Sequence, residues 1–208
     1  DTTGEVLESH PVSVTAEQLE EALAQFRGDI EQIPPMYSAI KVNGKKLYEL
    51  ARKGKEVERK PRPVTIHALT LEEQIASDEY VIRVRCSKGT YVRTLCHDIG
   101  QVLGCGACMS SLRRTMAAGF TLEQAVTLTD VQEKGADLLL PVDEFFASHP
   151  ALILPTARLE KLCRCGNPLF IPGTENGTYR IYGQNGEFLC LSCAENGTLT
   201  SIKNFFGA

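Results

Sequence analysis

The 208-residue sequence contains no apolar run long enough to span a membrane, so a membrane-embedded protein is not expected. Residues 1–5 have neither the basic start nor the apolar stretch of a signal peptide, which favours a cytoplasmic location. An excess of positive charge is also lacking, because the formal net charge is −4. This balance argues weakly against a nucleic-acid partner, although a local basic patch could still bind RNA.

The apolar content is that of an ordinary soluble protein, and the length suits one or two domains with a real core. Thr15 and Gln18 form a capping box ahead of an expected helix at 16–27. Residues 80–86 alternate so that four apolar side chains share one face, which predicts a half-buried strand. The other expected elements are a short helix at 45–53, a strand at 64–75, a helix at 92–103 that ends at Gly104, and short helices after Thr121 and at 143–146.

The tail, residues 159–208, has a different pattern of short apolar runs. These runs are separated by Asn176-Gly177, Asn185-Gly186 and Asn196-Gly197, dipeptides that favour tight hairpin turns. The pattern predicts a small antiparallel sheet or barrel. Because Pro150 and Pro155 bracket an expected linker, we predict one domain at 1–150 and a second at 151–208.

Residues 41–62 are strongly basic, with nine Lys and Arg against three Glu and a local charge of +6. Most such runs are simply solvated surface. Here the local sign opposes that of the whole chain, and Tyr37 and Tyr48 lie in and beside the run. Because Lys and Arg neutralise phosphates and tyrosines can stack on exposed bases, contact with nucleic acid is the favoured interpretation.

Polar residues also lie at the expected junction between the strand at 80–86 and the helix at 92–103. Tyr91 and Arg93 are two residues apart, close to Lys88, and Arg113 and Arg114 follow a glycine-rich loop. Junction residues often line sites because the scaffold on each side holds them still. From spacing alone, a half-buried aromatic and a surface charge explain Tyr91 and Arg93 at least as well as catalysis does.

Four blocks of the sequence resemble, in order and spacing, segments of the TruB family, enzymes that convert uridine 55 of tRNA to pseudouridine. The blocks are Asp1-Thr2-Thr3-Gly4, Pro35 to Lys41 with Gly44 to Tyr48, Cys86 to Leu95, and Gly104 to Ala107 followed by Leu112-Arg113-Arg114. The second block resembles the family's RNA-contacting thumb loop, which here would span 35–63. The tail is similar to the small C-terminal RNA-binding domain of the bacterial enzymes.

The resemblance implies an α+β fold, with a mixed, largely antiparallel sheet, flanking helices and a small C-terminal β domain. It implies chemistry without a cofactor, a bound metal or an obligate protein partner. In this family an aspartate starts cleavage of the glycosidic bond of a uridine flipped out of the tRNA T arm, and the base turns over and rejoins through carbon 5.

The resemblance also assigns roles to single residues. Tyr91 would stack on the flipped base and help to remove the carbon-5 proton, Arg93 would pair with the aspartate and hold it ionised, and Leu112 would pack against the base. The residues expected to contact RNA are Tyr37, Lys41, Lys45, Lys46, Arg52, Lys53, Lys88, Arg113 and Arg114.

One departure from the family pattern is large. The family's aspartate lies in a Gly-His-x-Gly-x-Leu-Asp-Pro block, and no such block occurs in this sequence. Asp1 matches a later family position, and the tyrosine that floors the family's pocket is missing too. The first hypothesis is therefore part of an isomerase without its nucleophile, and the alternative is an RNA-binding module that grips the T arm without chemistry. Residues upstream of Asp1 in the parent gene would distinguish the two.

Eight cysteines allow several interpretations. Disulfides are not expected without a secretory signal. Cys163-x-Cys165 with Cys190-x-x-Cys193 could bind zinc, and the tail would then be a zinc-stabilised β domain with an unrelated partner. The first pair has too short a spacer, however, and a three-residue offset in a strand puts Cys190 and Cys193 on opposite faces. Small buried thiols are the favoured interpretation.

The 208-residue chain by itself is expected to make no pseudouridine, because well-placed supporting residues cannot replace a missing nucleophile. The test is to incubate the purified chain with a T-arm hairpin RNA and to quantify pseudouridine after nuclease digestion. Turnover above the level of a protein-free control would contradict the prediction.

Overall fold

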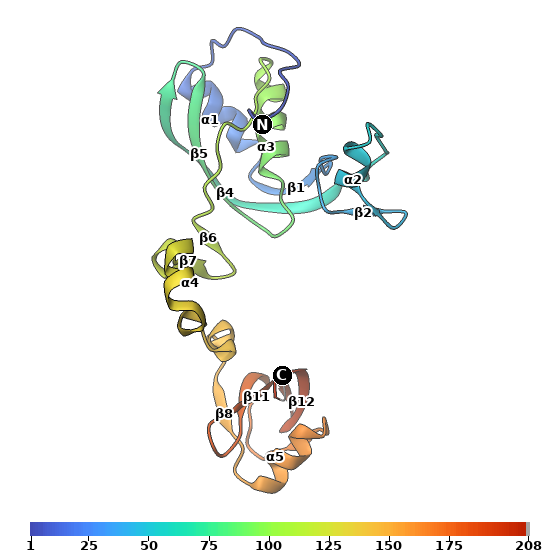
Figure 1. The fold of residues 1–208 in the computed structure, drawn as a ribbon, viewed down its shortest axis with the longest axis vertical. Coiled ribbons are helices and arrows are strands. Elements are labelled where there is room, and N and C mark those ends of the chain that lie inside the picture. Colours follow the sequence, from blue (N-terminus) through green and yellow to red (C-terminus); the bar gives the residue numbers. More distant parts are fainter. Residues whose placement is uncertain (207–208) are drawn as a thin grey trace. The chain divides into compact units, whose positions relative to one another are not determined.

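A computed structural model of the chain describes residues 1–206 (Figure 1). The chain forms two compact units, Asp1–Ala118 and Gly119–Ala208. Both combine helices with largely antiparallel strands. Within residues 1–206, no helix combines the length and the apolar character needed to cross a membrane.

The first unit is built on a three-stranded antiparallel sheet. Its strands β1 (Gly28–Gln32), β4 (Arg62–Ala76) and β5 (Glu79–Cys86) lie in the order β1-β4-β5. Helices α1 (Ala16–Ala24) and α3 (Val92–Leu103) pack against it. The buried core between helices and sheet consists of Leu19, Ala22, Leu23, Ile66, Leu69, Leu95 and Ile99. Alternate residues of β5, from Tyr80 to Cys86, pack against this core, which confirms the alternating pattern.

The helix ends follow local sequence signals. Thr15 and Gln18 form the predicted capping box at the start of α1. The helix ends at Ala24, three residues before the predicted end, because Phe26 and Arg27 donate to carbonyls three residues back instead of four. Helix α3 has the predicted bounds, and Gly104 ends it in the left-handed conformation that glycine adopts freely (φ 76°).

The thumb segment, residues 35–63, connects β1 to β4. It contains a two-stranded hairpin, β2 (Lys41–Val42) with β3 (Lys45–Lys46), and the short helix α2 (Leu47–Ala51). Asn43 and Gly44 form the predicted tight turn, both with positive φ (51° and 80°). The predicted helix at 45–53 begins later, at Leu47, because Lys45 and Lys46 belong to the hairpin.

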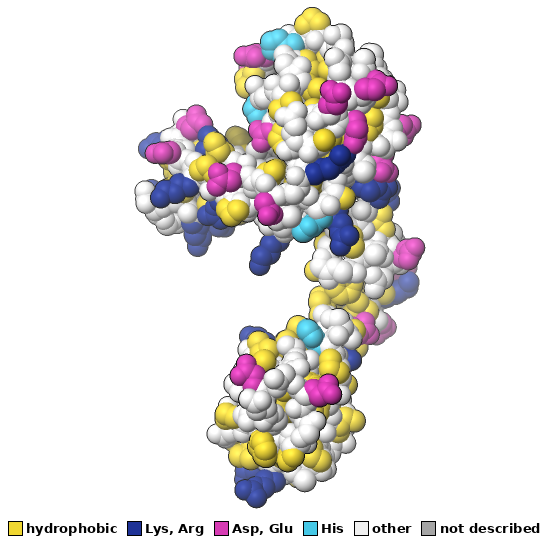
Figure 2. All heavy atoms as spheres, turned by 180° about the vertical axis from the view of Figure 1, so that it is seen from behind, with side chains coloured by type: hydrophobic (Ala, Val, Ile, Leu, Met, Phe, Trp, Pro, Cys, Tyr) yellow, Lys and Arg dark blue, Asp and Glu magenta, His cyan; other side chains and the backbone are white. Residues whose placement is uncertain are grey.

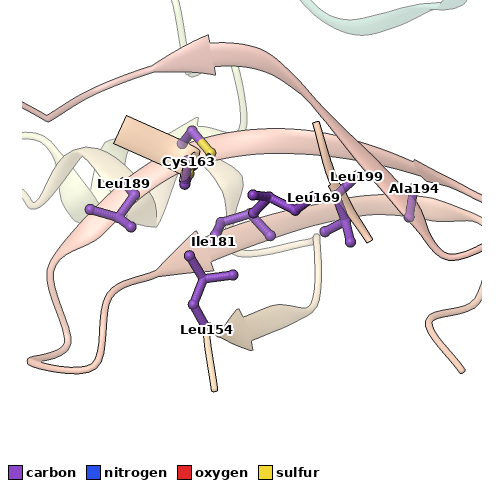
Figure 3. Packing of buried hydrophobic residues seen from close by; sticks show 8 residues of the cluster. Leu154, Cys163, Leu169, Ile181, Leu189, Ala194 and Leu199 are labelled. Carbon is purple, nitrogen blue, oxygen red and sulfur yellow. Dashed lines mark hydrogen bonds between the residues drawn. The ribbon is translucent and has the colours of Figure 1, made fainter. Parts of the chain in front are cut away.

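The second unit contains a five-stranded sheet in the order β8-β10-β11-β12-β9. Strand β8 runs parallel to β10, and the other neighbours are antiparallel. The strands are β8 (Ala151–Ile153), β9 (Leu169–Phe170), β10 (Gly177–Tyr182), β11 (Phe188–Glu195) and β12 (Thr198–Asn204). Helix α5 (Ala157–Arg164) contributes to the buried core, which includes Leu154, Cys163, Ile181, Leu189 and Leu199 (Figure 3).

Shorter elements occupy residues 116–146. They are β6 (Met116–Ala117), β7 (Phe120–Thr121), the 3-10 helix η1 (Leu122–Gln124), α4 (Leu128–Lys134), and the 3-10 helices η2 (Gly135–Leu138) and η3 (Val142–Phe146). The capping box at Thr121 is present, although it opens a 3-10 turn.

Two of the three Asn-Gly dipeptides in the tail form or lie in turns between strands, as the sequence pattern predicted. Asn196-Gly197 forms the turn between β11 and β12, and Asn185-Gly186 lies in the turn before β11. Asn176-Gly177 makes no hairpin and instead leads into β10. Helix α5 was not predicted, although Thr156 caps it. The boundary proposed near 150 stays a prediction; that position directly precedes β8, the first strand of the five-stranded sheet.

Gly100 allows the loop after α3 to pack tightly against the helix. It is buried, and its carbonyl accepts a hydrogen bond from Gly106 N at 3.0 Å. A Cβ added at Gly100 would lie 2.1 Å from the backbone nitrogen of Ala107. Backbone atoms at that distance cannot move aside as a flexible side chain could, so only glycine fits.

Gly100→Ala is therefore expected to destabilise the first unit by about 2 kcal/mol or more, since it overpacks a backbone contact. Urea unfolding followed by circular dichroism measures the change. Gln101→Ala, at the exposed neighbouring position of α3, is the control and should change stability little. Equal stabilities of the two variants would contradict the close packing.

Candidate functional site

Tyr91 is held at the junction between β5 and α3. It is the residue immediately before the helix, with extended backbone angles (φ −101°, ψ 104°) and a partly exposed side chain. The preceding turn is braced because Ser87 N donates to Thr65 O at 2.8 Å, Thr65 N donates to Ser87 Oγ at 3.0 Å, and Thr90 Oγ1 donates to Ser87 O at 2.9 Å. Tyr91 therefore lies at a strand-to-helix junction whose backbone is restrained by hydrogen bonds.

A buried glutamine holds the backbone of Tyr91. Gln32, the last residue of β1, is 1% exposed. Its Oε1 accepts a hydrogen bond from Tyr91 N at 2.9 Å, and its Nε2 donates to Tyr91 O at 3.4 Å. Sequence reasoning missed both β1 and Gln32, because Gly28–Gln32 has a single strongly apolar residue and no clear strand pattern.

Arg93 connects the first turn of α3 to the thumb segment. Its Nη2 donates to the carbonyl oxygen of Tyr37 at 3.1 Å, and its Nη1 lies 3.5 Å from Asp1 Oδ2. The ion pair with Asp1 is long and solvent-exposed, so it contributes little to stability. The structure thus brings together three residues that are distant in sequence, Asp1, Tyr37 and Arg93.

The loop before Leu112 lies beside the first residues of the chain. Thr2 N donates to Met109 O and Thr2 Oγ1 donates to Ser110 O, both at 3.2 Å. Leu112 is 56% exposed and Tyr37 is 57% exposed, so both apolar surfaces are open to a ligand. Lys88, Arg113 and Arg114 are also exposed.

The hairpin of the thumb segment concentrates positive charge. Lys41 and Lys46 are direct cross-strand partners, a like-charge pairing that destabilises an isolated hairpin. Lys46 Nζ donates to the Tyr48 hydroxyl at 3.2 Å, and this bond raises the pKa of Lys46. Arg52 lies over the same tyrosine ring, 5.3 Å from its centroid. An anionic ligand would relieve the repulsion between these cations.

The buried side chain of Leu47 and two backbone hydrogen bonds hold the hairpin in place. Leu47 is fully buried, its N–H donates to Ile40 O at 2.8 Å, and Tyr48 N donates to Ser38 O at 3.1 Å. Lys41, Lys45, Arg52 and Lys53 remain exposed. Figure 2 shows Lys and Arg side chains gathered on the lobe that the thumb segment forms.

Comparisons with known proteins decide the family. A family described as "TruB family pseudouridylate synthase (N terminal domain)" matches residues 1–92, and "tRNA pseudouridylate synthase B C-terminal domain" matches residues 93–147. The chain belongs to the TruB family. The family predicted from the four sequence blocks is thereby confirmed.

Relatives within the TruB family are similar over almost the whole chain. A tRNA pseudouridine synthase B from an Azoarcus species is 46% identical over 203 residues, covering 96% of this chain and 67% of its own length. A protein of the same name from Stutzerimonas stutzeri is 48% identical over 209 residues, covering 96% of this chain and 68% of its own length. The chain thus spans about two thirds of the length of these relatives.

Solved structures support the predicted α+β fold. A chain in the crystal structure of a Cbf5–Nop10–Gar1 complex has a TM-score of 0.65 and 23% identity, covering 95% of this chain and 63% of that one. A chain in an H/ACA RNP bound to a substrate RNA containing 2′-deoxyuridine also has a TM-score of 0.65, with 21% identity and coverage of 96% and 63%. The predicted fold class is confirmed.

The four tail cysteines of this TruB family chain do not all come together, and only Cys163 and Cys190 are in contact. Cys163 Sγ lies 3.5 Å from Cys190 Sγ in the buried core, and that contact, together with burial, raises the pKa of Cys163. Cys165 is exposed, and Cys193 lies three residues along β11 from Cys190, hence on the other face. Across residues 1–206, no three His, Cys, Asp or Glu side chains form a group suited to a metal ion.

Cys190→Ser is expected to destabilise the second unit by about 1 kcal/mol or more, because it replaces a buried thiol with a more polar hydroxyl. Cys165→Ser should be nearly neutral, since Cys165 is exposed. Thermal unfolding and metal analysis of the purified proteins test this. Stoichiometric zinc, or equal damage from both substitutions, would instead indicate a four-cysteine metal site.

Proposed function

We propose that this chain is the RNA-gripping and pocket-supporting part of a tRNA pseudouridine synthase that acts on uridine 55 in the T arm. The observation that carries the proposal is the hydrogen bond from Arg93 to the carbonyl of Tyr37. It places the start of α3 next to the thumb segment. In this proposal Tyr91, a residue suited to base stacking, and the basic hairpin contribute to one RNA-binding surface of the first unit.

The basic hairpin is suited to the phosphate backbone. Lys41, Lys45 and Lys46 crowd a short two-stranded hairpin, residues 41–46. The ring of Tyr48 contacts the charged groups of Lys46 and Arg52 without neutralising either. Binding of a polyanion releases counterions and removes the repulsion between Lys41 and Lys46. In this proposal Lys53, Lys88, Arg113 and Arg114 extend the same contact.

In the proposed reaction, Tyr91 stacks on the flipped uridine and helps to remove its carbon-5 proton. Arg93 holds the catalytic aspartate ionised, since a neighbouring cation favours the charged carboxylate. The exposed Leu112 packs against the base and excludes water. The aspartate belongs to the Gly-His-x-Gly-x-Leu-Asp-Pro block that this sequence does not contain. We therefore expect the 208 residues by themselves to bind the substrate without turning it over. The proposed reaction needs no cofactor and takes place in the cytoplasm.

The second candidate function is a T-arm RNA-binding module with no catalytic role. The exposed basic hairpin supports it as well as it supports the isomerase. The two functions are separated by adding a peptide or domain that carries the aspartate block: pseudouridine formation that depends on Tyr91 supports the isomerase, and its absence supports the module.

Replacing Lys45 and Lys46 by Gln is expected to weaken binding of a T-arm hairpin RNA about tenfold at 0.1 M salt, because two phosphate contacts are lost. The slope of log affinity against log salt should become shallower by about 2. Fluorescence anisotropy across a salt series measures both quantities.

The matched control removes two positive charges outside the thumb segment, by Arg83→Gln and Lys134→Gln. Both side chains form exposed ion pairs, with Glu72 and Asp130, so little stability should be lost. If this control weakens binding as much as the hairpin variant does, the affinity reflects overall charge and the proposed grip is wrong.

A further inference from the structure

Gln32 lies where the thumb segment leaves the sheet. It is the last residue of β1, and its backbone pairs with Arg62, the first residue of β4. The chain between these two residues, 33–61, contains all but the last two residues of the thumb segment. The Gln32–Arg62 pair is thus the base on which the thumb segment stands.

The side chain of Gln32 reaches from this base to Tyr91. Its amide spans the backbone of Tyr91, accepting from the N–H at 2.9 Å and donating to the carbonyl at 3.4 Å. The same carbonyl accepts the first hydrogen bond of α3, from Leu95 N at 3.0 Å. Both peptide groups of Tyr91 are therefore tied down, which restricts its φ and ψ and so the direction of its Cα–Cβ bond.

Burial makes this clamp firm. Gln32 is 1% exposed, so water cannot replace either bond when it breaks. Buried polar groups left without partners are costly, and the amide of Gln32 has these two bonds to satisfy it. The ring of Tyr91, by contrast, is partly exposed. A fixed backbone with a free ring is the arrangement that a stacking platform requires.

We propose that Gln32 is a positioning residue, which orients the ring of Tyr91 toward the target uracil. Through its backbone pairing with Arg62, Gln32 also links this orientation to the point where the thumb segment leaves the sheet. The inference rests on the proposed function, in which Tyr91 stacks on the flipped uridine. Gln32 itself touches no RNA in this proposal. It acts through the Tyr91 backbone, so its loss should affect recognition of the base and leave contact with phosphates unchanged.

The test compares two T-arm hairpin RNAs, one with uridine and one with an abasic site at the target position. The ratio of their dissociation constants isolates the contribution of the base. For the unmodified chain we expect a ratio of about tenfold, the size of one base stacked on an aromatic ring. For Gln32→Met, which keeps the volume and loses both hydrogen bonds, the ratio should fall below about threefold with an unchanged salt slope.

Three further variants make the outcome specific. Tyr91→Ala should bring the ratio close to one, and adding Gln32→Met to it should cause no further loss, because both act on the same contact. Gln101→Met replaces an exposed glutamine of α3 and should leave the ratio at its original value. Gln32→Glu retains the acceptor oxygen and loses the donor, so an intermediate ratio is expected if Gln32→Met does not fold.

The outcomes separate this inference from the function on which it rests. A folded Gln32→Met or Gln32→Glu variant with an unchanged ratio, or with equal weakening for both RNAs, overturns the positioning role and leaves the proposed function standing. An unmodified chain that binds both RNAs equally overturns the stacking role of Tyr91 and the inference with it.

Discussion

The antiparallel pairing of β1 with β4 brings the two ends of the thumb segment together at Gln32 and Arg62. The site depends on this pairing. It attaches both ends of the thumb segment to a sheet that packs against α1 and α3. The ends of the thumb segment are therefore held by the buried core of the first unit. The pairing also places the buried amide of Gln32 within hydrogen-bonding distance of the Tyr91 backbone, 59 positions further along the chain.

The first unit combines two kinds of interaction: buried contacts that stabilise the backbone, and repulsion between like charges at the surface. The contacts of Gln32 and Gly100 are buried and that of Ser87 is part-buried, and they restrain the backbone. Lys41 and Lys45 are exposed and Lys46 is half-buried, and the cross-strand pairing of Lys41 with Lys46 opposes the hairpin fold. The buried anchor Leu47 offsets that repulsion, so the hairpin can keep its charges ready for a polyanion.

Much of the fold was predictable, because it follows from local patterns. The capping box of α1, the alternation in β5, the left-handed Gly104 and the Asn43-Gly44 turn are each short-range rules, and the structure confirms them. The misses have physical reasons. Strand β1 is mostly polar and is held by pairing with β4, and α5 was masked by the turn-rich composition around it.

The sequence by itself determined which residues are candidates for chemistry and which family the chain belongs to, since charge, spacing and residue type are properties of the chain. Only the tertiary structure decided how those candidates are held. It placed Arg93 on the carbonyl of Tyr37, separated Cys165 from the buried pair Cys163 and Cys190, and gave Gln32 its role beside Tyr91. These are contacts between residues tens of positions apart, and no local periodicity specifies them, because they arise only when the sheet and its helices pack.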